Sequence, residues 1–589
     1  MSGFFRVGIF FRFRSCFTEM PVTCGAWIDI FPCVAFLPVI LLPKLQGVCP
    51  MIKHVMIAIV PLAAVLVLPL LFRWTLHSEE NPVVADGQVT RLVIVTPHNE
   101  SIRHEFDLAF KRWYRDAYNQ NVDIDWRSPG GTSDIVRQVD DLFHGSFKTY
   151  WQASGKSWNE IVAEAFNNKY LDPNDDKADP QAHEARQLFL QSEVGIGVDL
   201  FFGGGQYDLY QQARKGHAVD SGLLASHPEW FREDVMPQSY SGEVFYDPQG
   251  RYVGACLSAF GICYNIDRIE MLGAEPPARW ADLAEPVFFQ QTAIADPTKS
   301  GSITKCFEMM IQQTMQEAVA ATDDEDAGKA KGWDDGLNLI KRISANARYL
   351  TDSASRVPRD VASGDTAAGM CIDFYGRAEA QWTAQQSGGR ERVRYVTPTG
   401  GSSISVDPIL LFRGAPNREV AIRFMEFVLS DAGQKLWNYR KDTPGGPEKY
   451  VLRRMPVRRD MYAPENRQYM ADADTDPYAE AAGFVYHGGW TGRHFGLIRQ
   501  IIRIMVMDAG PELREAWGAI LAAGGPEAVP EAMVAFNALP FSYDQAGDVG
   551  QKLSGHGTED DVLTAMKQQQ EYADFFRKTY NKARLLALR

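Results

Sequence analysis

The sequence predicts two α/β lobes joined by two extended crossings of the chain. Strand-like apolar runs alternate with amphipathic helices in residues 91–205, and a second strand–helix set runs from the strand before Asp296 to Ala367–Gly376. Two long extended runs, Tyr252–Asn265 and Arg394–Phe412, connect these sets. Strands that alternate with helices are typical of a parallel sheet covered by helices. We therefore expect an α/β fold with its ligand cleft between the lobes, at the carboxyl ends of the strands.

The order of elements follows from hydrophobic periodicity. On the helix expected over residues 101–118, for example, apolar side chains recur every three or four positions. In the first lobe the sequence predicts a strand within Arg91–Glu100, that helix, a strand over Asn121–Trp126, a helix after Pro129-Gly130-Gly131 and a strand within Val194–Gly205. Residues from about 461 onward have helical character throughout, and we expect them to form an extra C-terminal region.

Length and charge limit the function classes. A chain of 589 residues is long enough for two or more domains. Its formal net charge of -14 argues against a nucleic-acid-binding surface, which normally carries a basic stripe. We expect no nucleic-acid partner.

The N-terminal region contains one long apolar run, Val55–Phe72, which has no charged residue. As a helix of this length it would span ~27 Å, close to the thickness of a bilayer's hydrocarbon core. It fits a signal peptide or an uncleaved membrane anchor equally, and either one exports the rest of the chain to the periplasm or cell surface. Met51 and Lys53 begin a conventional signal, so we interpret residues 1–50 as a spurious N-terminal extension and 51–90 as the signal or anchor plus a linker.

Two helix N-termini are candidate anion sites. Ser300, Gly301 and Ser302 lie where a strand gives way to a helix, and Thr132 and Ser133 begin a helix in the first lobe. The first turn of a helix leaves backbone N–H groups unpaired, and these groups bind anions. None of these hydroxyl residues has the Glu or Gln three positions later that would complete a capping box. We expect both helix ends to face the cleft and to hold an anionic or hydroxyl-rich ligand.

Other loops that follow strands supply further candidate residues. We expect ligand contacts from His98, Gly203, Gly204, Asp373 and Tyr375, which stand at the ends of predicted strands. Only His98 and Tyr375 are considered as metal ligands, and the preferred interpretation has no metal and no cofactor. The motifs of serine hydrolases, zinc peptidases and dinucleotide-binding folds are missing from the sequence, so we do not expect an enzyme.

Several segments, in this order, resemble the extracellular solute-binding proteins of ABC importers. They are "DLFFGGG", "SAFGICYNIDRIEMLGAEPPARWADL", "IADPTKSGS", "VPRDVASGDTAAGMCIDFYG" and "DPILLFRGAPNREVAIRFMEFVLSDAGQKLW". The resemblance runs from about Arg91 to Tyr462, and it is strongest to the ferric-ion and hexose-phosphate-binding branch. It implies a type II periplasmic binding fold that closes over a ligand. We place the first lobe in residues 91–257 and 396–460, the second in 258–395 and the helical extension in 461–589.

The resemblance also implies the class of ligand. In ferric-binding relatives the turn that matches Ser300–Ser302 holds the anion that accompanies the iron. Those relatives have adjacent tyrosines where this chain has Phe374-Tyr375, a histidine matching His98, and a glutamate where Gly204 stands. Because two anionic oxygen ligands are missing, a small anionic, phosphorylated solute fits better than ferric ion. The implied partners are a permease and an ATPase subunit. The alternatives are a ferric-ion receptor of the same fold, and a sensory domain or an enzyme on this scaffold.

Overall fold

A computed structural model describes residues 89–172, 179–555 and 559–589 of the chain. The expectations for residues 1–50 and for the apolar run Val55–Phe72 lie outside these residues. Within the described ranges, no helix is both long and apolar enough to cross a membrane. Cys256, Cys263, Cys306 and Cys371 are buried free thiols.

The first lobe is built on a mixed sheet in the order β2-β1-β3-β12-β7. β1 pairs in parallel with both β2 and β3, whereas β12 runs antiparallel to β3 and β7. The strands are β1 (Thr90–Val95), β2 (Val122–Arg127), β3 (Leu200–Phe202), β4 (Ala218–Val219), β7 (Tyr252–Asn265), β12 (Ile404–Phe412) and β13 (Met455–Pro456).

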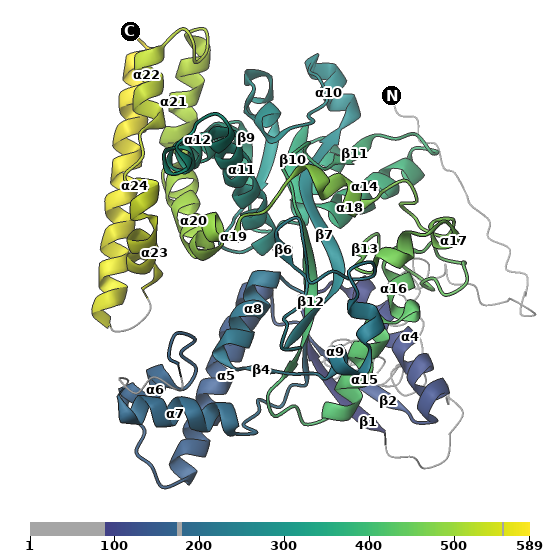
Figure 1. Ribbon diagram of the computed structural model, residues 1–589. Helices are drawn as coiled ribbons and strands as arrows, with labels where there is room; N and C mark the ends of the chain where they lie inside the picture. The colour runs from purple at the N-terminus through teal and green to yellow at the C-terminus, as the bar shows by residue number, and fades with distance from the viewer. Residues whose placement is uncertain (1–88, 173–178, 556–558) are drawn as a thin grey trace, which may run out of the picture. The chain divides into compact units, whose positions relative to one another are not determined.

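Helices cover both faces of this sheet, as β1 shows. Leu92 and Ile94 point into one core and Val93 and Val95 into the other, because successive side chains of a strand face opposite sides. The first core contains α4 and α15, and the second contains α5, α7 and α8 (Figure 1). The helices of this lobe are α4 (Glu100–Tyr118), α5 (Thr132–Ala153), α6 (Glu160–Ala165), α7 (Pro180–Gln191), α8 (Gln206–Lys215), α15 (Arg418–Leu429) and α16 (Asp431–Asn438).

The second lobe continues the sheet from β7 in the order β10-β8-β9. β8 is parallel to β9 and β10, while β10 and β11 are antiparallel to β7. Its strands are β8 (Thr292–Ala295), β9 (Ala347–Thr351), β10 (Ala368–Ile372) and β11 (Val393–Val396), and its helices are α10 (Ile266–Leu272), α11 (Gly301–Ala320), α12 (Glu325–Ala345), α13 (Arg356–Ser363) and α14 (Asp373–Gln386).

Two segments join the lobes. The half of β7 before residue 260 pairs with β12, and the half from residue 260 onward pairs with β10 and β11, so this strand crosses from one lobe to the other. The expected single run Arg394–Phe412 is two strands, β11 in the second lobe and β12 in the first. Residues 397–403 form the return crossing, where Gly400 has a φ of 60° that interrupts an extended chain.

The C-terminal region packs as helices on the second lobe. Short helical turns occupy most of residues 459–494, and longer helices begin at Phe495. They are α20 (Phe495–Ile502), α21 (Gly510–Ala522), α22 (Pro530–Asn537), α23 (Ala546–Ser554) and α24 (Glu559–Ala587), which Figure 1 shows beside α11 and α12. The packing includes a hydrogen bond from Trp517 Nε1 to Asn346 Oδ1 (2.8 Å). These helices and the second lobe therefore share one apolar core.

Two element predictions were wrong at the cleft. The strand expected within Val194–Gly205 is only β3, because Gly197, Gly203 and Gly204 have positive φ values that do not fit a strand. Asp373–Tyr375, expected as a loop, is the first turn of α14, which follows β10 without a gap.

Candidate ligand site

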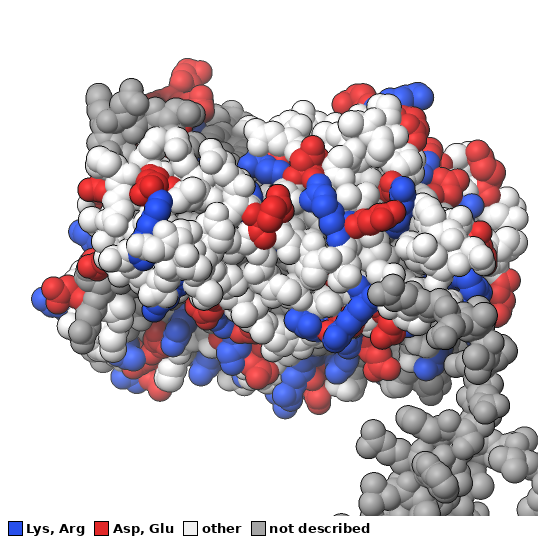
Figure 2. All heavy atoms as spheres, turned by 90° about the horizontal axis from the view of Figure 1, so that it is seen from below, with Lys and Arg blue, Asp and Glu red and all other residues white. Residues whose placement is uncertain are grey.

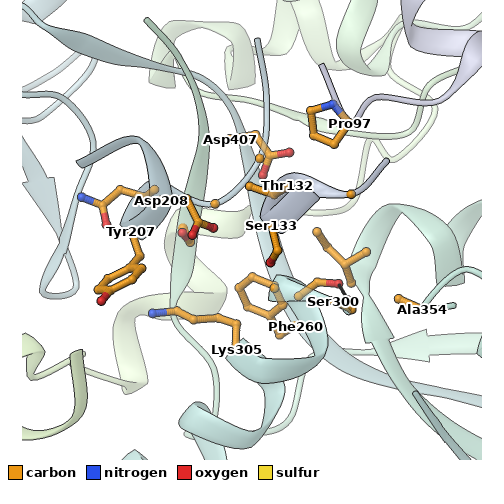
Figure 3. A pocket seen from close by; sticks show the side chains of 18 of the residues that line it. Pro97, Thr132, Ser133, Tyr207, Asp208, Phe260, Ser300, Lys305, Ala354 and Asp407 are labelled. Atoms are coloured by element: carbon orange, nitrogen blue, oxygen red, sulfur yellow. Dashed lines mark hydrogen bonds between the residues drawn. The ribbon is translucent and has the colours of Figure 1, made fainter. Parts of the chain in front are cut away.

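A cavity of about 590 Å³ lies between the two lobes. The segments that follow β1, β3, β8, β9 and β10 open into it, as expected for the carboxyl edge of an α/β sheet. In Figure 3, Thr132 and Ser133 face Ser300 and Phe260 across this space. The cavity brings together eight of the predicted residues: His98, Thr132, Ser133, Gly204, Ser300, Gly301, Ser302 and Tyr375.

The N-terminus of α11 is open to the cavity. Ser300 is the N-cap: its Oγ accepts a hydrogen bond from Ile303 N (3.3 Å) and lies 3.0 Å from Ser302 Oγ. Among the described residues, no group accepts a hydrogen bond from the N–H of Gly301 or Ser302. The cap satisfies one of the free N–H groups and leaves these two for a ligand.

The N-terminus of α5 differs from the prediction. The N-cap is Gly131, and the Asp134 carboxylate accepts a hydrogen bond from Gly131 N (3.0 Å). Asp134 therefore occupies the N–H of the N-cap residue, and its charge repels an anion there. Among the described residues, no group accepts a hydrogen bond from the N–H of Thr132 or Ser133, so these two N–H groups remain for a ligand together with the two hydroxyls. The two helix ends lie close together, since a Cβ on Gly131 would be 3.5 Å from the carbonyl oxygen of Lys299.

His98 and the glycines after β3 pack against each other. A Cβ on Gly203 would lie 2.3 Å from His98 Nε2, so only glycine fits beside this ring. Gly203 supports His98 and does not itself line the cavity. Burial, followed by the charge of Arg454, lowers the pKa of His98 and outweighs the raising effect of Asp407. Both ring nitrogens are buried without a hydrogen-bond partner in the described part of the chain.

Asp373 does not line the cavity, contrary to the prediction, although its neighbours Ile372 and Phe374 do. Its carboxylate is 1% exposed and accepts no hydrogen bond of good geometry. Burial raises its pKa to about 6, although Arg377 and Arg454 oppose this shift. Tyr375, two residues later, lines the cavity, and burial raises the pKa of its phenol.

Sequence reasoning missed a buried ion pair at the first-lobe wall. Arg454 is 1% exposed and donates to Asp407 Oδ2 (2.7 Å), while Ser258 Oγ donates to Asp407 Oδ1 (3.0 Å). The guanidinium carbon of Arg454 also lies 4.4 Å from the ring centroid of Phe374. Ser258 lies on β7, Asp407 lies on β12 and Arg454 directly precedes β13. Because they are far apart in the sequence, no local motif identifies them.

A second buried cluster surrounds Lys305 on α11. Its Nζ lies 2.8 Å from Glu243 Oε1, 3.0 Å from Glu308 Oε2 and 3.7 Å from the ring centroid of Tyr486. Tyr486 donates its hydroxyl proton to Glu308 Oε1 (2.7 Å). The spacing of Ser302, Lys305 and Glu308 at three-residue intervals places them on one helix face, a signal that the sequence did offer.

The charge of the lining gives no general attraction for anions. Six carboxylates and four Lys or Arg residues line the cavity. Lys305, Arg454 and Arg137 are already paired with carboxylates. The face in view in Figure 2 has no dominant sign either, since basic and acidic side chains are interspersed over it. Of the four Lys or Arg residues of the lining, only Lys299 has no ion pair within the described residues, so an anion would be held by local groups near the end of α11 and not by net charge.

The described residues contain no group of three or more His, Cys, Asp or Glu side chains that could hold a metal ion. His98 and Tyr375 both line the cavity, and the Asp407 carboxylate, whose Oδ2 lies 3.8 Å from His98 Nε2, is already paired with Arg454.

The model of a family described as bacterial extracellular solute-binding protein matches residues 198–466. The matched segment covers less than half of the chain. The match confirms the predicted class of protein, a solute-binding receptor of ABC import systems. The matched segment ends at residue 466, so nearly all of the helical extension 461–589 lies outside it.

Two bacterial proteins resemble part of the chain. An uncharacterized protein of Haemophilus influenzae is 23% identical over 285 residues, which cover 47% of this chain and 71% of that protein. The phosphoglycerate transport regulatory protein PgtC of Salmonella typhimurium is 21% identical over 213 residues, which cover 36% of this chain and 47% of PgtC.

Solved structures of periplasmic binding proteins align with low scores. AfuA from Actinobacillus pleuropneumoniae, with fructose-6-phosphate bound, has 16% identity and a TM-score of 0.40 over 67% of this chain and 95% of its own. Iron-bound HitA from Pseudomonas aeruginosa has 14% identity and a TM-score of 0.41 over 70% of this chain and 99% of its own.

Proposed function

We propose that the protein captures a small anionic solute, carrying a phosphate or a similar group, between its two lobes and delivers it to an ABC permease and its ATPase. The observation that carries this proposal is the open N-terminus of α11, where the N–H groups of Gly301 and Ser302 face the cavity without acceptors. In this proposal the protein is exported, held in the periplasm or at the membrane surface, and performs no catalysis.

The N-terminus of α11 suits an anion for two reasons. The helix dipole places about half a positive charge there. Each hydrogen bond to a charged group contributes roughly 1.5–3 kcal/mol, so two or three would dominate the affinity for a small ligand. Gly301 matters because it has no side chain between an anion and the backbone. The likeness to PgtC, whose name refers to phosphoglycerate transport, agrees with a phosphorylated solute.

Transport requires a change of shape. β7 and residues 397–403 are the two connections about which the lobes would close. A ligand that contacts α11 from one lobe and Thr132 or Ser133 from the other binds the closed state more tightly, and this difference drives closure.

Calorimetry tests the proposal with inorganic phosphate, fructose 6-phosphate and fructose as probes. We expect the phosphorylated sugar to bind and fructose to fail. Gly301→Val should abolish binding, while the melting temperature of the free protein stays nearly unchanged. Gly145→Val is the matched control, because no atom lies within 4 Å of a Cβ at Gly145 on α5. Binding of fructose as tight as that of its phosphate would overturn the proposal.

A further inference from the structure

Helix α20, in the C-terminal extension, reaches the ligand cavity. Its Arg499 donates from Nε to Thr304 Oγ1 (3.2 Å) on α11 and from Nη1 to Ser133 Oγ (3.4 Å) on α5. A Cβ on Gly301 would lie 3.4 Å from Arg499 Nη2. The guanidinium therefore lies at the open end of α11 and also touches the first lobe.

The third nitrogen of this guanidinium is unused. Nη2 is buried and has no hydrogen-bond partner in the described part of the chain. Arg499 also forms no ion pair with any described carboxylate, unlike Lys305 and Arg454. A buried N–H donor without an acceptor is costly, and a ligand atom at the end of α11 would supply the acceptor.

A ring contact makes the same connection between α20 and the first lobe. Phe495 lies beneath the Arg499 guanidinium, with 4.8 Å between the ring centroid and the guanidinium carbon. The Phe495 ring also lies 5.1 Å from that of Tyr207 on α8. Both aromatic residues line the cavity, and Figure 3 shows Tyr207 at its side.

We infer that the C-terminal extension is a third wall of the ligand site and that Arg499 is its anion-binding residue. Residues 495–502 lie beyond the segment 198–466 that matches the solute-binding family and outside both lobes of the sheet. The inference rests on the proposed function, because it concerns how the same anion is held.

The guanidinium adds what the helix end lacks. Two backbone N–H groups supply donors but only a partial charge. Arg499 supplies a full charge and a planar fork that suits phosphate and carboxylate oxygens. Arg499 also donates a hydrogen bond to Ser133 of the first lobe, so the residue that binds the anion contacts the lobe that closes over it.

The experiment measures binding of fructose 6-phosphate and inorganic phosphate to the full chain by calorimetry. We expect Arg499→Gln to weaken binding of the sugar phosphate about 30-fold, as the loss of one charge-assisted contact implies. Arg499→Lys keeps the charge but loses the fork, and we expect a loss of about 5-fold. Arg503→Gln is the matched control, since it removes the same charge four residues away at a half-exposed side chain paired with Asp508.

Each outcome decides one question. If wild type binds neither phosphate probe, the proposed function fails. If wild type binds fructose 6-phosphate and Arg499→Gln binds it equally well, only this inference fails. If Arg499→Gln does not fold, Arg499→Lys decides: unchanged affinity together with an unchanged melting temperature would overturn the role of the guanidinium fork.

Discussion

Arg454 Nη2 lies 2.7 Å from Asp407 Oδ2, and this ion pair is buried in the first-lobe wall of the cavity. Burial alone would raise the pKa of Asp407, but Arg454, His98 and Ser258 together hold it below its ordinary value. The same carboxylate keeps the pKa of Arg454 above its usual range despite burial. Asp407 therefore stays ionised despite burial, and its charge compensates that of the buried Arg454 guanidinium.

Asp407→Asn should destabilise the protein strongly, because it leaves the Arg454 guanidinium buried without its counter-charge. Removing one partner of a buried pair costs ~3–5 kcal/mol. Urea unfolding followed by circular dichroism measures the loss. The double variant Asp407→Asn/Arg454→Met should recover much of it, since no unpaired charge remains. A loss below ~1 kcal/mol in the single variant would show that the pair is not buried in solution.

Asp373 should make stability depend on pH near 6. Its folded pKa of about 6 lies above its ordinary value of 3.8, so the fold favours the protonated carboxyl. Its stabilising effect is complete below pH ~4 and is lost as the pH rises through 6, a difference of ~3 kcal/mol. Asp373→Asn should therefore raise the free energy of unfolding at pH 7.5 and change it little at pH 4. Urea unfolding at both values checks this, and an equal effect at the two would contradict the burial argument.

The sequence predicted elements whose pattern is local. β7 was expected over Tyr252–Asn265 and has these bounds, because a run of fourteen apolar or small residues leaves little alternative to a buried strand. The open N-terminus of α11 was also predictable, since Ser300 and Gly301 follow an apolar run and precede a helical one. A helix N-terminus is encoded by a few neighbouring residues.

Features that depend on distant residues were not predictable. Arg499 and its partner Ser133 are 366 positions apart, so only the fold brings them together. Asp373 was assigned to the cavity because it follows a strand, yet α14 begins at that residue and turns it into the interior. At α5 the capping rule tested Glu and Gln only, whereas Asp134 is the residue that closes the turn.

Ferric ion should not be the tight ligand. Tyr375 has a phenylalanine, Phe374, as its neighbour in the chain and not a second tyrosine. Burial also raises the pKa of the Tyr375 phenol and so disfavours the tyrosinate that iron needs. Titration with ferric nitrilotriacetate should give no visible tyrosinate-to-iron band. Tyr375→Phe should behave like wild type in the same titration. A strong band that this substitution removes would contradict the prediction and favour an iron receptor.

Replacing Lys305 should destabilise the second lobe strongly, because this lysine neutralises two buried carboxylates. Glu243 and Glu308 are 3% and 0% exposed. Burial alone would lower the pKa of Lys305, but these carboxylates hold it above its ordinary range. Lys305→Met leaves both carboxylates without a cation, and we expect a loss of ~3–5 kcal/mol at pH 7.5.

The pH dependence of that loss identifies its cause. Burial penalises the charged form of a carboxyl that has lost its cation, so the penalty of Lys305→Met is full where carboxyls are ionised and decreases in acid. The difference between wild type and Lys305→Met in urea unfolding should therefore be smaller at pH 5 than at pH 7.5.

Lys329→Met is the matched control. Lys329 also contacts two carboxylates, but Glu325 and Asp326 are 63% and 94% exposed, so we expect the free energy of unfolding to fall by only ~0–1 kcal/mol. Equal losses for the two lysine variants would show that the Glu243–Lys305–Glu308 cluster is open to solvent, and that the ligand cavity is wetter than its geometry indicates.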